Sequence, residues 1–195
     1  MVKYENEITV EVNTTFDELN EILIANNFVV QEEYDLIDIY MVKKECDITN
    51  DALEVLSNCL LIRNIITKEE NKKKITYKYK EYNDKREIIK QGKVDCDITS
   101  IEEAKSLLES IGYQELIKIN DHLIVYANEK TELAVQLVND KHIYIEIEDK
   151  CNYISRKYES IEEMINDFKQ YNIPIKGDNY FVKKAEIELM EYLNK

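Results

Sequence analysis

The sequence of 195 residues predicts an α+β protein in which an eight-stranded antiparallel β-barrel is surrounded by helices. Three observations support this prediction. Nearly every candidate strand alternates apolar with charged or polar residues, which is typical of strands with two unlike faces. Segments of helical periodicity are interleaved with these strands and need an apolar surface to cover. The order strand, capped helix, long strand occurs twice, so we expect two similar halves within a single domain over residues 1–195.

The first half opens with a strand over residues 7–12, in which acidic or polar residues alternate with apolar ones. Thr15, followed three residues later by Glu18, forms a capping box and predicts a helix that runs to about residue 26. β-branched and aromatic residues from 28 to 42 then predict a long strand.

Polar turns divide the middle of the chain into shorter elements. Thr49 or Asn50 can cap a short helix. Residues 59–66 and 74–82 are predicted to form a strand pair joined by a lysine-rich turn, and residues 86–98 a further strand.

The second half repeats the opening order and then adds a hairpin. Ser100 and Glu103 form a capping box for a helix that Gly112 ends, and a long strand follows to about residue 126. The last segments are strands over 132–138 and 142–150 that turn across an Asn-Asp pair, and helices over about 160–171 and 179–193.

The direction of burial leads from this fold to a function. Ile143, Ile145 and Ile147 alternate along the last strand and offer the helices an apolar surface, so the polar faces should point into the barrel. A small barrel normally fills its interior with apolar side chains, and a charged interior makes sense as a wet tunnel for a ligand. The sequence therefore predicts a polar binding tunnel.

Charge and composition exclude several partners. With 26 Lys+Arg against 40 Asp+Glu, the formal charge is −14, which disfavours nucleic acid and anionic membranes. No apolar run approaches the roughly 20 residues of a membrane span. The N-terminus lacks the basic-then-apolar order of a signal peptide, so we expect a soluble, cytoplasmic protein. Neither a P-loop nor a Rossmann glycine pattern occurs.

Acidic and basic side chains share the inferred inward faces, a mixture that suits a polyphosphate bound together with a divalent metal. Lysine and arginine neutralise non-bridging oxygens, and carboxylates bind Mg²⁺ or Mn²⁺ through hard oxygen contacts. His122, His142 and Arg156 are assigned to packing or to the surface. The residues assigned to inward faces are Glu7, Glu11, Asp38, Tyr40, Arg63, Lys78, Lys80, Glu87, Lys118, Glu146 and Glu148.

In the order and spacing of these segments the sequence resembles the CYTH superfamily, the triphosphate tunnel metalloenzymes. This superfamily includes class IV adenylate cyclases, thiamine triphosphatases and inorganic triphosphatases. The resemblance covers nearly the whole chain. The segments that carry it are EITVEV at 7–12, DIY at 38–40, LLIR at 60–63, ITYKYK at 75–80, KIN at 118–120 and YIEIE at 144–148.

The chain departs from the motifs of this superfamily at several positions. The N-terminal ExExK signature appears as Glu7, Thr9 and Glu11, so its second acid and its lysine are replaced. Leu61 and Asn120 stand where the superfamily has phosphate-binding cations. On this alignment, Thr9→Glu combined with Glu11→Lys should restore a metal ligand and a cation together.

The resemblance implies roles for the residues that match. The ligand would be a small-molecule polyphosphate or a nucleoside triphosphate, and a homodimer is left open as the assembly. The residues implied in catalysis are Arg63, Lys78 and Lys118. The same three, together with Lys80, Lys85 and Arg86, are implied in substrate binding. The residues implied as ligands of Mg²⁺ or Mn²⁺ are Glu7, Glu87, Glu146 and Glu148.

Three functions remain open at this point. Metal-dependent hydrolysis of a triphosphate is the first, with water attacking the terminal phosphorus. Conversion of ATP to cyclic AMP is the second, because a ribose 3′-hydroxyl can use the same group of cations. The third is binding of a phosphorylated ligand without turnover, which the replaced motif residues favour.

Overall fold

A computed structural model describes residues 6–49, 51–82 and 88–194, with residues 79–82 and 88–91 described for their backbone alone. The described residues form an eight-stranded antiparallel sheet and five helices, so the predicted α+β class is confirmed. The elements in chain order are β1 (Glu7–Glu11), α1 (Phe16–Ala25), β2 (Val29–Lys43), α2 (Ala52–Ser57), β3 (Leu60–Ile66), β4 (Asn71–Tyr82), β5 (Ile88–Ile98), α3 (Ile101–Ser110), β6 (Tyr113–Ala127), β7 (Glu132–Val138), β8 (His142–Glu148), α4 (Ile161–Lys169) and α5 (Lys184–Leu193).

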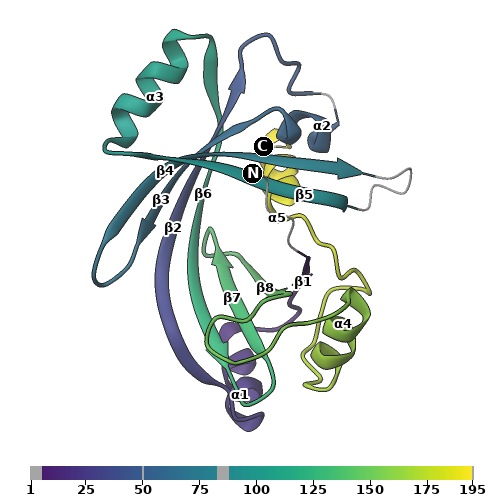
Figure 1. Cartoon of the computed structure of the whole chain (residues 1–195). Coiled ribbons are helices and arrows are strands. Elements are labelled where there is room, and N and C mark those ends of the chain that lie inside the picture. The colour runs from purple at the N-terminus through teal and green to yellow at the C-terminus, as the bar shows by residue number, and fades with distance from the viewer. Residues whose placement is uncertain (1–5, 50, 83–87, 195) are drawn as a thin grey trace. The chain divides into compact units, whose positions relative to one another are not determined.

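The strands follow the order β1-β8-β7-β6-β2-β3-β4-β5 across the sheet (Figure 1). Within the described residues, no hydrogen-bonded ladder joins the end strands β1 and β5. The closed barrel therefore stays a prediction. No helix in the described part of the chain combines the length and the apolarity that a membrane crossing requires.

The chain divides into two compact units that interleave along the sequence. The described part of unit 1 comprises residues 35–121 and 183–194, and that of unit 2 comprises residues 6–34 and 122–182. Strands β2 and β6 each contribute one end to each unit. We describe the two units separately.

In unit 2, one apolar face of the sheet packs against α1 and α4. Ile145 and Ile147 of β8 are buried in this core, and Ile143 packs at its margin, as the alternation predicted. Leu23 of α1 and Met164 of α4 are fully buried in the same core. Each such side chain contributes about 1.5–3 kcal/mol relative to an exposed one.

Two local signals in unit 2 are confirmed in detail. The Thr15 hydroxyl accepts a hydrogen bond from the backbone N–H of Glu18, whose carboxylate accepts one from the backbone N–H of Thr15. The β7–β8 hairpin turns at Asn139 and Asp140, with φ values of 50° and 56°. Asn and Asp adopt this left-handed conformation more readily than other non-glycine residues, so the turn follows from its sequence.

Unit 1 also has one apolar and one polar sheet face. The apolar face packs against α3 through Ile39, Met41, Ile62, Ala104 and Leu108. Alternation therefore turns Asp38 and Arg63, next to Ile39 and Ile62 in sequence, to the opposite face.

Several predicted element boundaries differ from the structure, and in three of them the structure shows the cause. The cap of α2 is Asp51 rather than Thr49 or Asn50, because its carboxylate accepts from the backbone N–H groups of Leu53 and Glu54. Strand β4 begins three residues earlier than predicted, because its lysine-rich start pairs with β3. Helix α5 begins at Lys184 instead of residue 179, because the residues before it extend along β1.

Candidate functional site

The polar face of unit 1 carries rows of charged side chains across four strands. Asp38 of β2 lies opposite Arg63 of β3, which lies opposite Lys74 of β4. Farther along β4, Lys78 lies opposite Lys93 of β5. One face of a chain whose net charge is −14 thus carries several basic side chains, and it also carries the acids Asp38, Asp95 and Asp97.

Arg63 and Asp38 form a two-pronged ion pair at the centre of this face. Arg63 Nε donates to Asp38 Oδ1 at 2.7 Å, and Nη2 donates to Oδ2 at 2.6 Å. The Asp38 side chain is only 4% exposed, and the Arg63 side chain is 18% exposed. Burial alone would raise the pKa of Asp38, but hydrogen bonding and charge from Arg63, together with Lys78 and Lys184, hold it below its usual value. Asp38 therefore fixes the guanidinium in one orientation.

A second buried acid lies near this pair and was missed by the sequence analysis. Asp121 of β6 accepts a hydrogen bond from Lys184 Nζ at 2.7 Å, and both side chains are largely buried. The pKa of Tyr40 is raised, first by burial and then by the negative charges of Asp38 and Asp121. The pair joins β6 to the first residue of α5, so it could be found only once the positions of both elements were known.

Lys118 of β6 is exposed, and its place in the binding site stays a prediction. Asp121, three residues further along the same strand, forms the buried ion pair with Lys184.

Lys74 is a basic residue of the polar face that the sequence analysis did not select. Its ammonium pairs with Asp95 at 2.9 Å, and Thr76 also donates to Asp95 at 2.7 Å. Lys80 lies opposite Gln91 in the ladder. The other predicted residues of this region, Lys85, Arg86 and Glu87, lie outside the described residues.

The polar face of unit 2 is acidic. Glu7 of β1 lies opposite Glu148 of β8, and the next pair on the same face joins Thr9 to Glu146. Like charges at opposite positions of a ladder repel each other unless a cation lies between or beside them. Among the described residues, no three Asp, Glu, His or Cys side chains gather in a group that could hold one metal ion.

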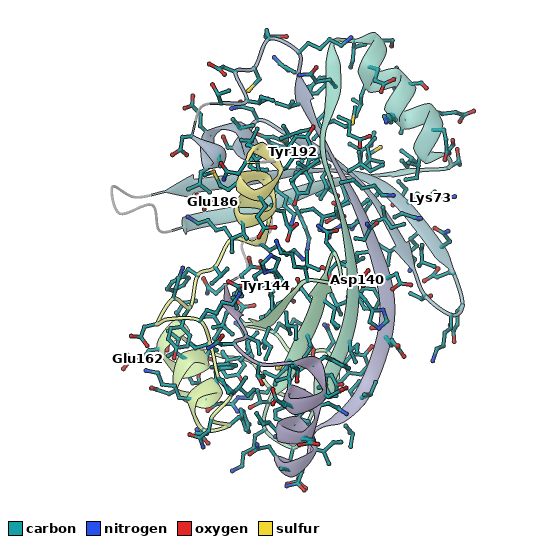
Figure 2. The ribbon with its side chains drawn as sticks, turned by 180° about the vertical axis from the view of Figure 1, so that it is seen from behind. Lys73, Asp140, Tyr144, Glu162, Glu186 and Tyr192 are labelled. Carbon is teal, nitrogen blue, oxygen red and sulfur yellow. The ribbon has the colours of Figure 1, made fainter. Side chains whose placement is uncertain are left out.

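Glu11 continues this face but has Lys176 and His142 as partners within unit 2. Its Oε1 accepts a hydrogen bond from Lys176 Nζ at 2.6 Å and lies 2.9 Å from His142 Nδ1. Next to His142 on the same face is Tyr144 (Figure 2), which lies opposite Glu11 in the ladder. His142 is therefore part of a polar cluster rather than a simple packing residue.

Arg156, which the sequence pattern assigns to the surface, is 25% exposed and lies in a cluster of ion pairs. Its guanidinium pairs with Glu163 at 3.1 Å and with Asp167 at 2.5 Å, and it lies over the Tyr158 ring at 4.3 Å. These contacts join the loop before α4 to the helix itself. Arg156 stabilises unit 2 and is unsuitable as a neutral control for mutagenesis.

The predicted site residues are thus distributed over two units. Arg63, Lys78 and Lys118 lie in unit 1, and Glu7, Glu146 and Glu148 lie in unit 2. Within unit 1, Arg63 and Lys78 share a face, and within unit 2 the three glutamates share a face. The convergence of all six in one tunnel stays a prediction.

No protein-family profile and no curated protein matches the chain. Solved structures do share its fold. The PH1819 protein from Pyrococcus horikoshii OT3 is 20% identical, with a TM-score of 0.69, and the match covers 96% of this chain and 99% of that chain. A Vibrio parahaemolyticus protein proposed to be an adenylate cyclase is 12% identical, with a TM-score of 0.59 and coverage of 96% and 99%.

A third similar structure comes from Hippeastrum and is described as revealing a dominant triphosphatase activity. It is 13% identical, with a TM-score of 0.60, and the match covers 96% of each chain. Likenesses at this level of identity concern the fold. They show that the chain shares its fold with these structures, and membership of the CYTH superfamily stays a prediction.

Proposed function

We propose that this protein binds a triphosphate compound and hydrolyses it with the help of Mg²⁺ or Mn²⁺. The observation that carries the proposal is the row of Arg63, Lys74 and Lys78 on the polar face of unit 1. The ligand is a small-molecule polyphosphate or a nucleoside triphosphate, and the site of action is the cytoplasm.

Arg63 is the central residue for recognition of phosphate. A guanidinium bound on one edge by Asp38 is already oriented when a ligand arrives, so little side-chain entropy is lost on binding. Lys74 and Lys78 add point charges along the neighbouring strand. Such preorganised cations would neutralise the charge that develops on the phosphate oxygens during transfer.

The acidic face of unit 2 suits a hard divalent cation. Mg²⁺ is commonly bound by one or two carboxylates, by water and by the substrate's phosphates, rather than by a cage of protein ligands. The opposed pair Glu7 and Glu148, with Glu146 as a neighbour, fits this donor chemistry. These residues would hold the ion, which as a Lewis acid would neutralise charge on phosphate oxygens.

Binding without turnover is a second candidate, and a specific observation favours it. Glu11 replaces the lysine of the N-terminal motif and is occupied by Lys176 and His142. Thr9, at the position of the second acid, is buried and cannot ligate a metal as a carboxylate would. A chain with these replacements can retain the phosphate-binding face and lose catalysis.

Phosphate release from tripolyphosphate, ATP and thiamine triphosphate, each with Mg²⁺ or Mn²⁺, tests the proposal. Turnover of any of the three supports hydrolysis, and cyclic AMP formed from ATP identifies the cyclase alternative. Binding of tripolyphosphate without turnover supports the second candidate. Absence of both binding and turnover would contradict both.

A further inference from the structure

The segment before α5 is held against β1 by backbone hydrogen bonds. Lys176 N–H donates to the Glu11 carbonyl at 2.8 Å, and Asn13 N–H donates to the Pro174 carbonyl at 2.9 Å. At the other end, Thr9 N–H donates to the Tyr180 carbonyl at 3.0 Å. The backbone of Lys176 therefore has a fixed position beside Glu11, as in a neighbouring strand.

The side chains of Lys176 and Glu11 are also joined. The Glu11 carboxylate is only 12% exposed, whereas the Lys176 side chain is 49% exposed. An ammonium has three N–H donors, and one of them is directed at Glu11 Oε1. The carboxylate is thus enclosed by its partners, and the ammonium is the charge that this cluster presents to solvent.

We propose that Lys176 is a phosphate-binding residue of unit 2 and that Glu11 positions it. This inference rests on the proposed function, in which the ligand carries a triphosphate. The resemblance places a cation at position 11, where this chain has a carboxylate. The structure brings a cation to the same place from a residue 165 positions away in the sequence.

The electrostatics of the cluster support this role. Without Lys176, Glu11 would add one more negative charge to a face that already carries Glu7, Glu146 and Glu148. With Lys176 paired to it, the negative charge of Glu11 is neutralised. A triphosphate can therefore approach this position without the full repulsion of a bare carboxylate.

Titration of the full chain with tripolyphosphate in the presence of Mg²⁺ tests the proposal. Two variants are compared whose expected effects on the affinity are opposite. Lys176→Gln should weaken binding roughly tenfold, because one charge-assisted contact is lost. Glu11→Gln keeps a hydrogen-bond acceptor for Lys176 and removes a negative charge, so it should tighten binding several-fold. Lys157→Gln, which removes an exposed lysine elsewhere in unit 2, is the matched control and should bind like the unmodified chain.

The outcomes separate the inference from the proposed function. If the unmodified chain does not bind tripolyphosphate, the proposed function fails and the role of Lys176 fails with it. If the chain binds and Lys176→Gln binds equally well, only the inference is overturned. If both variants lower the melting temperature and neither changes affinity, the pair is a structural ion pair, and the inference is again overturned.

Discussion

The polar face of unit 1 pairs acidic with basic side chains, whereas that of unit 2 places acidic side chains beside one another. In unit 1, the acids Asp38 and Asp121 are buried beneath Arg63 and Lys184, which are the more exposed partners. In unit 2, glutamates lie opposite one another or next to one another along β1 and β8. In each unit, the polar face lies on the side of the sheet opposite an apolar face that helices cover. The same sheet architecture thus produces a face of acid–base pairs in one unit and a mainly acidic face in the other.

The comparison also shows what each face needs in order to be stable. A buried ion pair is kept because removing one partner leaves an uncompensated charge in a low-dielectric environment. The carboxylates of unit 2 are more exposed and can rely on water or on a bound cation. Substitutions should therefore act mainly on stability in the centre of unit 1 and mainly on ligand or metal binding in unit 2.

The largest expected effect follows from removing Arg63. Arg63→Ala leaves Asp38 buried without its partner, and breaking a buried pair in this way costs about 3–5 kcal/mol. The free energy of unfolding in urea measures this loss. The double variant Arg63→Met with Asp38→Leu should recover most of the stability but not the binding of tripolyphosphate. A single variant as stable as the unmodified chain would show that the pair is not buried in solution.

Literal restoration of the N-terminal motif is the next test. The alignment alone predicts that Thr9→Glu with Glu11→Lys restores activity, but the structure leads to the opposite expectation. Thr9 is buried opposite Glu146, so a new carboxylate there is desolvated beside a like charge. Lysine at position 11 would lie beside Lys176 and His142. We expect a lower melting temperature and no gain in phosphate release.

A charge exchange between β1 and its neighbouring segment sharpens this test. Glu11→Lys combined with Lys176→Glu keeps an ion pair between the same two positions and moves the cation onto β1. This variant should melt close to the unmodified chain and at a higher temperature than Glu11→Lys alone. Equal melting temperatures for the single and double variants would show that the pair contributes nothing to stability.

Acid should destabilise unit 1 through Asp38. The pKa of Asp38 is lowered in the folded protein, so its contribution to stability is present above the unfolded pKa of about 3.9. That contribution is lost as the pH falls through the lower folded pKa. Melting temperatures measured from pH 6 to pH 2 should decline less steeply in Asp38→Asn, whose side chain does not titrate. Identical slopes would contradict the assignment.

The smallest predicted effect compares two adjacent lysines of β4. Lys74 points to the polar face and Lys73 (Figure 2) to the opposite face, because side chains alternate along a strand. Lys74→Ala should weaken tripolyphosphate binding roughly tenfold, the value of one charge-assisted contact. Lys73→Ala should leave the affinity unchanged. Equal losses would indicate non-specific attraction to positive charge.

Much of the fold could be predicted from the sequence because the signals are local. The Thr15 and Glu18 pair caps a helix within one turn, and Asn139-Asp140 sets a hairpin within two residues. Alternation along β8 decides which residues can be buried together. Such patterns depend on neighbours in the sequence, so they determined the elements and the two-faced character of the strands.

The partners of the site residues could not be predicted in this way. Arg63 meets Asp38 through the register of two strands, and Glu11 meets Lys176 through a segment near the other end of the chain. On β6, Lys118 is exposed, whereas Asp121, three residues further on, is buried in an ion pair. Charge pairing depends on distance and burial in three dimensions, which periodicity does not encode. The sequence by itself therefore determined that charged faces exist, and only the tertiary structure decided which charges lie beside each other and which of them are buried.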